Sequence, residues 1–151
     1  MIARGSFTPI SLSFLPSILF LAIHFFYGKF FLYISLILIL FPLFTIIFFR
    51  DPDRKIGKGI VSPADGKIIK IDKKKNSLDI FMNLTDIHVN RSPVKGNIAE
   101  IESIKGKHNP AFLDSSEKNH KNRILLRTEK GNIVIWQIVG FLARRIVPYV
   151  Q

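Results

Sequence analysis

Residues 30–49 read FFLYISLILILFPLFTIIFF, 20 residues without a charge, and this stretch sets the architecture of the chain. A helix of about 20 apolar residues crosses a bilayer core, so the stretch predicts a membrane-spanning helix. The preceding residues 10–27 are also uncharged but shorter, and they contain Pro16 and His24. We predict a second span there. Only Gly28 and Lys29 separate the two segments, which predicts a tight helical hairpin whose ends emerge on the same side.

Charge is segregated along the 151 residues, which carry a formal net charge of +11. Residues 1–49 contain two basic and no acidic side chains, so they contribute +2, and residues 50–151 contribute +9. Basic residues flank both outer ends of the hairpin, whereas one lysine lies at its turn. This asymmetry predicts that both ends face the cytoplasm. A cleaved signal peptide is the competing interpretation, but the apolar stretch is too long and lacks a small-residue cleavage site.

Residues 50–151 are long enough for one modest core, and their pattern is mainly β. Short runs rich in Ile and Val are separated by turn-type pairs such as Asp65 with Gly66. The runs lie at 66–71, 77–82, 97–104, 124–128 and 132–139. We predict a small β-sandwich or barrel-like domain over 50–151, preceded by an N-terminal transmembrane hairpin within 1–49. Residues 109–122 are predicted as a long loop with one helical turn near Phe112.

Composition narrows the possible partners and chemistry. The chain has no cysteine, which excludes a disulfide scaffold, a thiol nucleophile and a zinc ribbon. His88, His108 and His120 lack paired-ligand spacing, so we expect no metal site. The positive charge suits a partner with phosphates, and the apolar hairpin favours anionic lipid over nucleic acid, for which the sequence has no recognition motif. A solvated basic face is an equally good account of the same charge.

Two segments contain titratable residues with catalytic potential: SPADGK around Asp65 and TDIHVNRSP around His88. In a strand, Asp86 and His88 would share one face, and Asp65 from another turn could approach the imidazole. A carboxylate there would fix the imidazole tautomer and raise the basicity of a general base. Two other interpretations stay open. An Asp-Gly pair between strands is often only a hairpin turn, and a lone histidine in a strand is often a core residue.

Five ordered blocks together resemble the phosphatidylserine decarboxylase family, in particular its short, membrane-anchored bacterial and archaeal forms. The blocks are FFRDPDR (48–54), VSPADGKI (61–68), DIHVNRSPVKG (86–96), SSEKNHKN (115–122) and QIVGFLARRIV (137–147). The resemblance implies pyruvoyl-dependent decarboxylation of phosphatidylserine, or of archaetidylserine in archaea, to the ethanolamine phospholipid. In that family a serine of a Gly-Ser pair near the C-terminus cleaves the chain and becomes the pyruvoyl group. Its carbonyl condenses with the substrate amine and withdraws electrons as carbon dioxide leaves.

The resemblance also implies roles for individual residues. Asp65 would support self-cleavage, and His88 would act as base in cleavage or as proton donor after decarboxylation. Longer family members carry a second histidine where this chain has Arg91, which blurs the two roles of His88. Arg91, Arg144 and Arg145 are candidates for binding the substrate phosphate or carboxylate, because arginine binds either group bidentately. A surface basic patch is the alternative interpretation of these arginines.

The family's pyruvoyl precursor has no counterpart in this sequence. The only Gly-Ser pair is Gly5 with Ser6, ahead of the apolar segments, so the precursor serine is expected beyond Gln151 or in a separate chain. We therefore expect most of a β subunit, incomplete at its C-terminus, whose partner is a small α subunit carrying the pyruvoyl group. Its expected location is the cell membrane, with the decarboxylase domain on the cytoplasmic face. The alternative function is a non-catalytic, membrane-attached β module that binds anionic lipid, or a truncated inactive relic.

Overall fold

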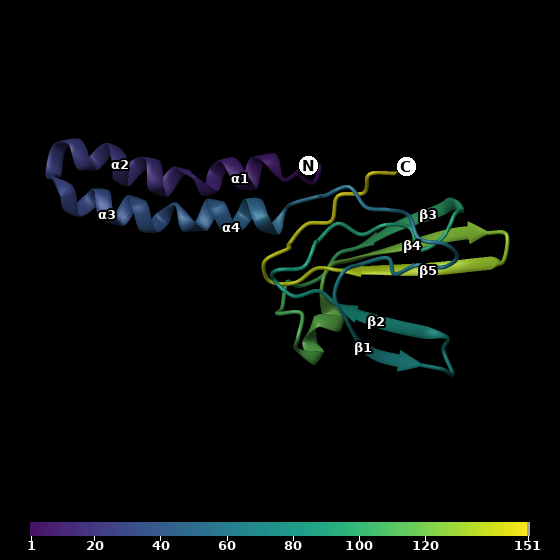
Figure 1. Ribbon diagram of the computed structural model, residues 1–151. Coiled ribbons are helices and arrows are strands. Elements are labelled where there is room, and N and C mark those ends of the chain that lie inside the picture. The colour runs from purple at the N-terminus through teal and green to yellow at the C-terminus, as the bar shows by residue number, and fades with distance from the viewer. Residues whose placement is uncertain (151) are drawn as a thin grey trace. The chain divides into compact units, whose positions relative to one another are not determined.

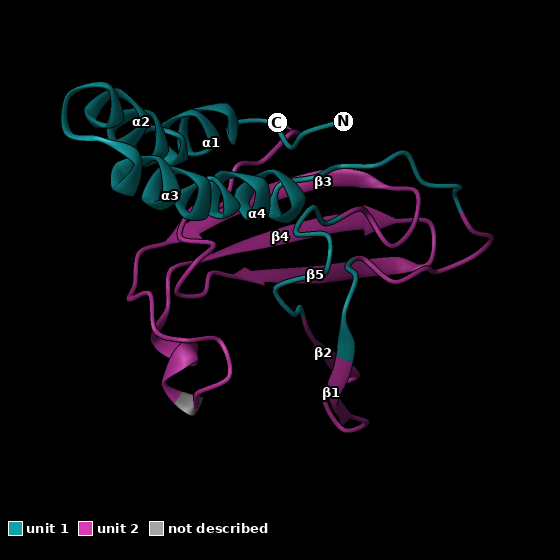
Figure 2. Cartoon of the chain, turned by 60° about the vertical axis from the view of Figure 1, so that its left-hand side comes forward, with its two compact units in different colours: residues 1–56, 64–67, 82–90 teal, residues 57–63, 68–81, 91–151 magenta. Residues whose placement is uncertain are grey.

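The computed structural model describes residues 1–150, apart from the side chain of residue 114, and these residues form two compact units (Figures 1 and 2). Unit 1 comprises residues 1–56, 64–67 and 82–90. Unit 2 comprises residues 57–63, 68–81 and the chain from residue 91 onward. Unit 1 therefore contains the predicted anchor and also two segments that return to it from the β-rich part of the sequence.

Two apolar helical segments make up most of unit 1. They run from Phe7 to Tyr27 and from Lys29 to Phe48, and both are long and apolar enough to cross a membrane. Only 17% and 11% of their most apolar windows are buried, which distinguishes them from the core helices of a soluble protein. The segments predicted at 10–27 and 30–49 overlap these helices, the first of which begins three residues earlier than predicted.

Each helical segment contains one irregularity close to a proline. The helices are α1 (Phe7–Ser13), α2 (Leu15–Tyr27), α3 (Lys29–Leu38) and α4 (Leu40–Phe48). Pro16 follows the break between α1 and α2, and Pro42 follows the break between α3 and α4. Because proline has no N–H, neither residue can donate to the carbonyl four positions earlier, and the helix is interrupted there.

Small hydroxyl side chains lie between the two helical segments. Ser13 Oγ and Thr45 Oγ1 are 3.0 Å apart, and Ser35 Oγ donates to the Ser17 carbonyl at 2.8 Å. All four residues are buried, although the flanking apolar side chains are largely exposed. Small residues let helix backbones approach closely, and the hydrogen bonds give the hairpin a defined register. Gly28 turns the chain between the segments with φ +96°, a conformation that favours glycine.

Unit 2 contains most of two separate antiparallel sheets. One has two strands, in the order β1-β2, and the other has three, in the order β3-β4-β5. The strands are β1 (Lys67–Asp72), β2 (Ser77–Phe81), β3 (Asn97–Ile104), β4 (Lys121–Thr128) and β5 (Gly131–Ile138). All five predicted runs are confirmed as strands, and β4 begins earlier than its run predicted. β4 and β5 form a hairpin, with Thr128 paired to Gly131.

The prediction of a mainly β sandwich or barrel is confirmed only in part. Helices and strands occupy similar lengths of the chain, and no closed barrel occurs among residues 1–150. A barrel requires every strand to have two neighbours, whereas β3 and β5 each pair only with β4 in the part described. The apolar helices and the long irregular connections account for the mixed content.

One buried amide joins three segments of unit 2. Asn119 is 1% exposed, and its Oδ1 accepts a hydrogen bond from the Asn109 N–H at 2.8 Å. Its Nδ2 donates to the Asn109 carbonyl at 2.8 Å and to the Val139 carbonyl at 2.9 Å. The predicted loop is thus fixed to the end of β5. Its helical turn is a 3-10 helix, Asp114–Lys118, slightly later than predicted.

Replacing Asn119 with alanine should destabilise unit 2 by roughly 2–4 kcal/mol, because buried backbone groups lose their hydrogen-bond partners. Unfolding in urea can be followed by the fluorescence of Trp136, the single tryptophan of the chain, which lies in this unit. Asn132→Ala, at an exposed position in β5, is the matched control and should change the free energy of unfolding by less than about 0.5 kcal/mol. Equal losses in the two variants would contradict the role assigned to Asn119.

Candidate active site

Residues 82–90 belong to unit 1 and contain the predicted catalytic histidine. The strand in which Asp86 and His88 would share a face does not form, because residues 84–85 form a turn and no strand covers the segment. Asp86 Oδ2 accepts a hydrogen bond from the Asn83 N–H at 2.6 Å, which closes this turn. An aspartate side chain competes effectively for nearby backbone donors, and here that local bond replaces an extended conformation. Asp86 and His88 therefore do not share a strand face.

The imidazole of His88 is held by one hydrogen bond and one ring contact. Its Nδ1 lies 2.9 Å from the Asp86 carbonyl oxygen. Because a carbonyl only accepts, Nδ1 carries the hydrogen, and in the neutral ring Nε2 keeps the lone pair. The ring stacks on Phe48, the last residue of α4, with centroids 4.0 Å apart and planes 28° from parallel.

Burial and nearby charges together set the pKa of the same imidazole. Burial lowers the pKa of His88 below 6.5, because the charged form loses hydration, and the positive charge of Arg50 lowers it further. The carbonyl and the carboxylate of Asp86 oppose this shift. The balance favours a neutral imidazole at pH 7, the form in which Nε2 can accept a proton.

Arg50 connects the end of α4 to the turn that precedes His88. Its Nη1 donates to the Ile47 carbonyl at 2.8 Å, and its Nη2 donates to the Thr85 carbonyl at 2.6 Å. A guanidinium satisfies two carbonyls in this way because its donors form a rigid, planar fork. The segment carrying His88 is therefore fixed to the last turn of the apolar helix.

Asp65 is held at both carboxylate oxygens. Its Oδ1 lies 3.0 Å from Arg54 Nη1, and its Oδ2 accepts a hydrogen bond from the Ile87 N–H at 3.3 Å. The structure thus brings Asp65 to the residue that precedes His88. The carboxylate bonds the adjacent peptide, whereas the hydrogen bond seen for the imidazole itself is to the Asp86 carbonyl.

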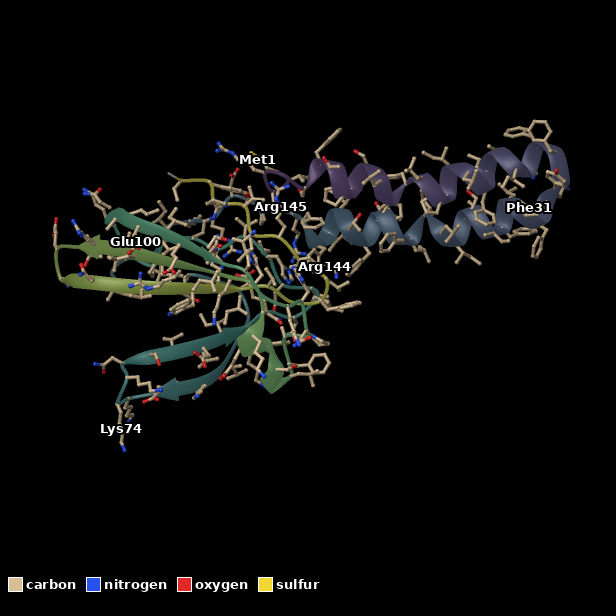
Figure 3. All side chains as sticks on the ribbon, turned by 180° about the vertical axis from the view of Figure 1, so that it is seen from behind. Met1, Phe31, Lys74, Glu100, Arg144 and Arg145 are labelled. Atoms are coloured by element: carbon tan, nitrogen blue, oxygen red, sulfur yellow. The ribbon has the colours of Figure 1, made fainter. Side chains whose placement is uncertain are left out.

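The three arginines predicted to bind substrate belong to unit 2. Arg91 is exposed, and its N–H donates to the Pro63 carbonyl at 2.8 Å. Arg144 and Arg145 are exposed neighbours in the irregular segment after β5 (Figure 3). The Arg144 carbonyl accepts a hydrogen bond from His108 Nε2 at 3.2 Å, so the contact made there is through the backbone. Their grouping with Asp65 and His88 stays a prediction.

Among the residues that the structure describes, no three His, Asp or Glu side chains are grouped as metal ligands. A depression of about 380 Å³ lies in unit 2, lined by residues 95–97 and 127–129, and none of the predicted site residues lines it.

Phe48, Arg50 and Arg54 are the contributors that reasoning from individual residues missed. The two arginines were interpreted as flanking charges that orient the hairpin, and the phenylalanine as part of the apolar stretch. The available signal was the block FFRDPDR, whose order resembles the family although the partners of its side chains lie far along the sequence.

Comparison with known proteins assigns the family. The model of the phosphatidylserine decarboxylase family matches residues 41–79 and 73–151. A "Putative archaetidylserine decarboxylase proenzyme" of Archaeoglobus fulgidus is 46% identical over 118 residues, covering 78% of this chain and 59% of the relative. A phosphatidylserine decarboxylase proenzyme of Syntrophus aciditrophicus is 44% identical over 123 residues, covering 72% of this chain and 58% of the relative.

Other relatives agree with this assignment. A second "Putative archaetidylserine decarboxylase proenzyme", from Methanosarcina acetivorans, is 45% identical over 109 residues, covering 70% of this chain and 51% of the relative. The chain thus spans between half and three fifths of the length of these curated relatives. No solved structure matches the chain. Because the family model covers residues 41–151 and the relatives share more than two fifths of the aligned residues, the chain belongs to the phosphatidylserine decarboxylase family.

Proposed function

We propose that this chain takes part in pyruvoyl-dependent decarboxylation of a serine phospholipid, phosphatidylserine or archaetidylserine, to the corresponding ethanolamine lipid. Family membership supports the reaction class. The observation that carries the proposal is the state of His88: a desolvated, neutral imidazole whose Nδ1–H is held by the Asp86 carbonyl, which leaves Nε2 as a proton acceptor. A proton carrier of this kind suits both self-cleavage and decarboxylation.

The pyruvoyl group would supply an electron-withdrawing carbonyl beside the substrate amine. The residues of unit 1 fit such a group, because a neutral imidazole neither repels a cationic amine nor lacks a site for a transferred proton. The single Gly-Ser pair, Gly5 with Ser6, precedes the apolar helices. We therefore assign the pyruvoyl group to a small α subunit that associates with this chain.

His88 would act at one atom in two directions. Nε2 would accept a hydroxyl proton during self-cleavage. In each later turnover the ring would take up a proton from solvent at Nε2 and donate it to the substrate carbon that has lost carbon dioxide. General acid–base catalysis of this kind contributes about 10²–10⁴-fold to a rate. Asp65, held at both oxygens, would support self-cleavage by fixing the backbone next to the imidazole. Arg91, Arg144 and Arg145 would bind the substrate phosphate or carboxylate.

The apolar helical hairpin would anchor this activity at the cell membrane. Two largely exposed apolar segments long enough to cross a bilayer support the anchor, and basic residues beyond both outer ends support a cytoplasmic location for the remainder of the chain. The lipid substrate would then be reached from the surface in which it resides.

Single cysteines introduced into this cysteine-free chain test the orientation. Lys29→Cys, at the exposed turn of the helical hairpin, should react with a membrane-impermeant maleimide in intact cells. Lys74→Cys, at the turn between β1 and β2 (Figure 3), should react only after the cells are made permeable. The reason is the positive-inside bias of the flanking arginines and lysines. The reverse labelling pattern would overturn the proposed cytoplasmic location.

The function itself is tested on protein purified, through an N-terminal tag, from the cells that make it. Mass spectrometry should find a pyruvoyl N-terminus in the preparation. Carboxyl-labelled phosphatidylserine or archaetidylserine should release labelled carbon dioxide, and hydroxylamine should abolish the release. His88→Gln should lower processing or turnover by at least about 10²-fold, because the proton carrier is lost.

His120→Gln, which alters a histidine of unit 2, is the control and should retain the activity. Lipid binding without release of carbon dioxide would favour the non-catalytic alternative. Release that resists hydroxylamine would contradict the pyruvoyl mechanism.

The electrostatics of His88 generate a separate prediction. Wild-type His88 should titrate below pH 6.5 in nitrogen-15 NMR spectra of the histidine rings, and Arg50→Gln should raise its pKa because a nearby positive charge is removed. Burial, the larger cause, persists in the variant, so the shift should be partial. Below pH 6.5 the unfolded histidine binds a proton that the folded one resists, so falling pH should destabilise unit 1 through that window.

Arg123→Gln, on the three-stranded sheet, is the matched control and should leave this titration unchanged. A wild-type pKa above 6.5, or no response to Arg50→Gln, would contradict the assignment.

A further inference from the structure

The block FFRDPDR contains a charged residue that the proposed mechanism does not use. We propose that Arg54 is a positioning residue, which fixes the carboxylate of Asp65 against the peptide that precedes His88. This inference rests on the proposed function, because it gives Arg54 its importance through the role of Asp65 in self-cleavage. Its structural content, a guanidinium that controls a carboxylate and a neighbouring amide, can be measured independently of catalysis.

The first support is the geometry at the carboxylate. Arg54 Nη1 contacts Oδ1 at 3.0 Å, while the Ile87 N–H donates to Oδ2 at 3.3 Å. A carboxylate bound at one oxygen can still rotate, whereas contacts at both oxygens fix its plane. The hydrogen bond from the Ile87 N–H is long, so by itself it restrains Asp65 weakly. The shorter, charged contact from Arg54 therefore holds the carboxylate in the position that Ile87 requires.

The second support is the partial burial of the pair. The side chains of Arg54 and Asp65 are 27% and 36% exposed. Arg54 Nη2 is fully buried and has no hydrogen-bond partner among the residues described. A buried donor without a partner is energetically unfavourable. The guanidinium thus occupies a position that its own hydrogen bonds do not fully satisfy, unlike an ordinary solvated surface arginine.

The third support is the place of Arg54 in the chain. The end of α4 and the short connection that follows it carry Phe48, which stacks on His88, and Arg50, which donates to the Thr85 carbonyl. Arg54 adds the segment of Asp65 to this arrangement. Residues 64–67 and 82–90 accordingly share unit 1 with the connection (Figure 2). One stretch of chain therefore fixes both candidate catalytic segments.

The test measures hydrogen exchange of the Ile87 amide by NMR, with the full chain in detergent micelles. Arg54→Gln should speed this exchange by roughly 2–10-fold, the range expected for losing one hydrogen bond. Arg54→Lys keeps a cation and should restore part of the protection. Asp65→Asn should match Arg54→Gln, and the double variant should show little further change, because both substitutions remove the same arrangement.

The matched control is Arg123→Gln. Arg123 contacts Glu100 at 3.1 Å and is 28% exposed, so it resembles Arg54 in contact length and burial but lies on the sheet of unit 2. The substitution Arg123→Gln should leave the hydrogen exchange of the Ile87 amide unchanged. In every variant, the amide of buried Leu126 in β4 reports whether unit 2 remains folded.

A second readout links the contact to self-cleavage in protein purified from its own cells. Arg54→Gln should slow the appearance of the pyruvoyl N-terminus, and Arg54→Lys should recover part of the rate. Unchanged Ile87 exchange in Arg54→Gln, or additive effects of Arg54→Gln and Asp65→Asn, would overturn the positioning role. Absence of a pyruvoyl group from wild-type protein would instead contradict the proposed function, while the exchange measurement would still decide the role of Arg54.

Discussion

A partly buried guanidinium must find negative partners close by, and this requirement organises the end of the helical unit. Removing Arg54 from water is unfavourable unless its charge is compensated, and the carboxylate of Asp65 compensates it at 3.0 Å. The remaining carboxylate oxygen then takes the Ile87 amide. Two segments that are distant in sequence are thereby fixed to the connection after α4. Charged and polar contacts of the connection therefore contribute to the conformation of both segments.

The imidazole of His88 also loses hydration, but burial favours its neutral form, whereas Arg54 and Asp65 remain a charged pair. His88 has an aromatic ring on one face and a carbonyl at Nδ1, so its neutral form is well accommodated and its charged form is not. The carboxylate of Asp86 moderates this preference, and the charge of Arg50 reinforces it. A charged pair and a neutral base can coexist within a few residues because each has its own partners. Acid and base roles are separated in this way in many active sites.

Sequence reasoning predicted the elements that a local pattern defines, and it missed contacts between residues that are distant in the sequence. The strand at 97–104 was predicted with its observed bounds, since alternation and flanking turn residues suffice to define it. The start of β4 was missed because its first residues are polar and do not continue the apolar pattern. Asn122 is nevertheless buried, and it pairs with Gln137 on β5. The turn at Asp86 was not predicted, because a side chain bonded to its own turn leaves no periodic pattern in the sequence. The partners of Arg50 and Arg54 lie 35 and 11 residues away, beyond the reach of any local pattern.

The stack of His88 on Phe48 has a consequence for the depth of the imidazole relative to a lipid bilayer. Phe48 is the final residue of the helical segment Lys29–Phe48, and a helix advances about 1.5 Å per residue. The imidazole therefore lies at the end of a helical segment whose length is fixed. If that segment spans a bilayer, the ring would lie at the level of the polar head groups and away from the hydrocarbon tails. Ester- and ether-linked lipids differ below that level, so discrimination between them would have to arise elsewhere than at this ring.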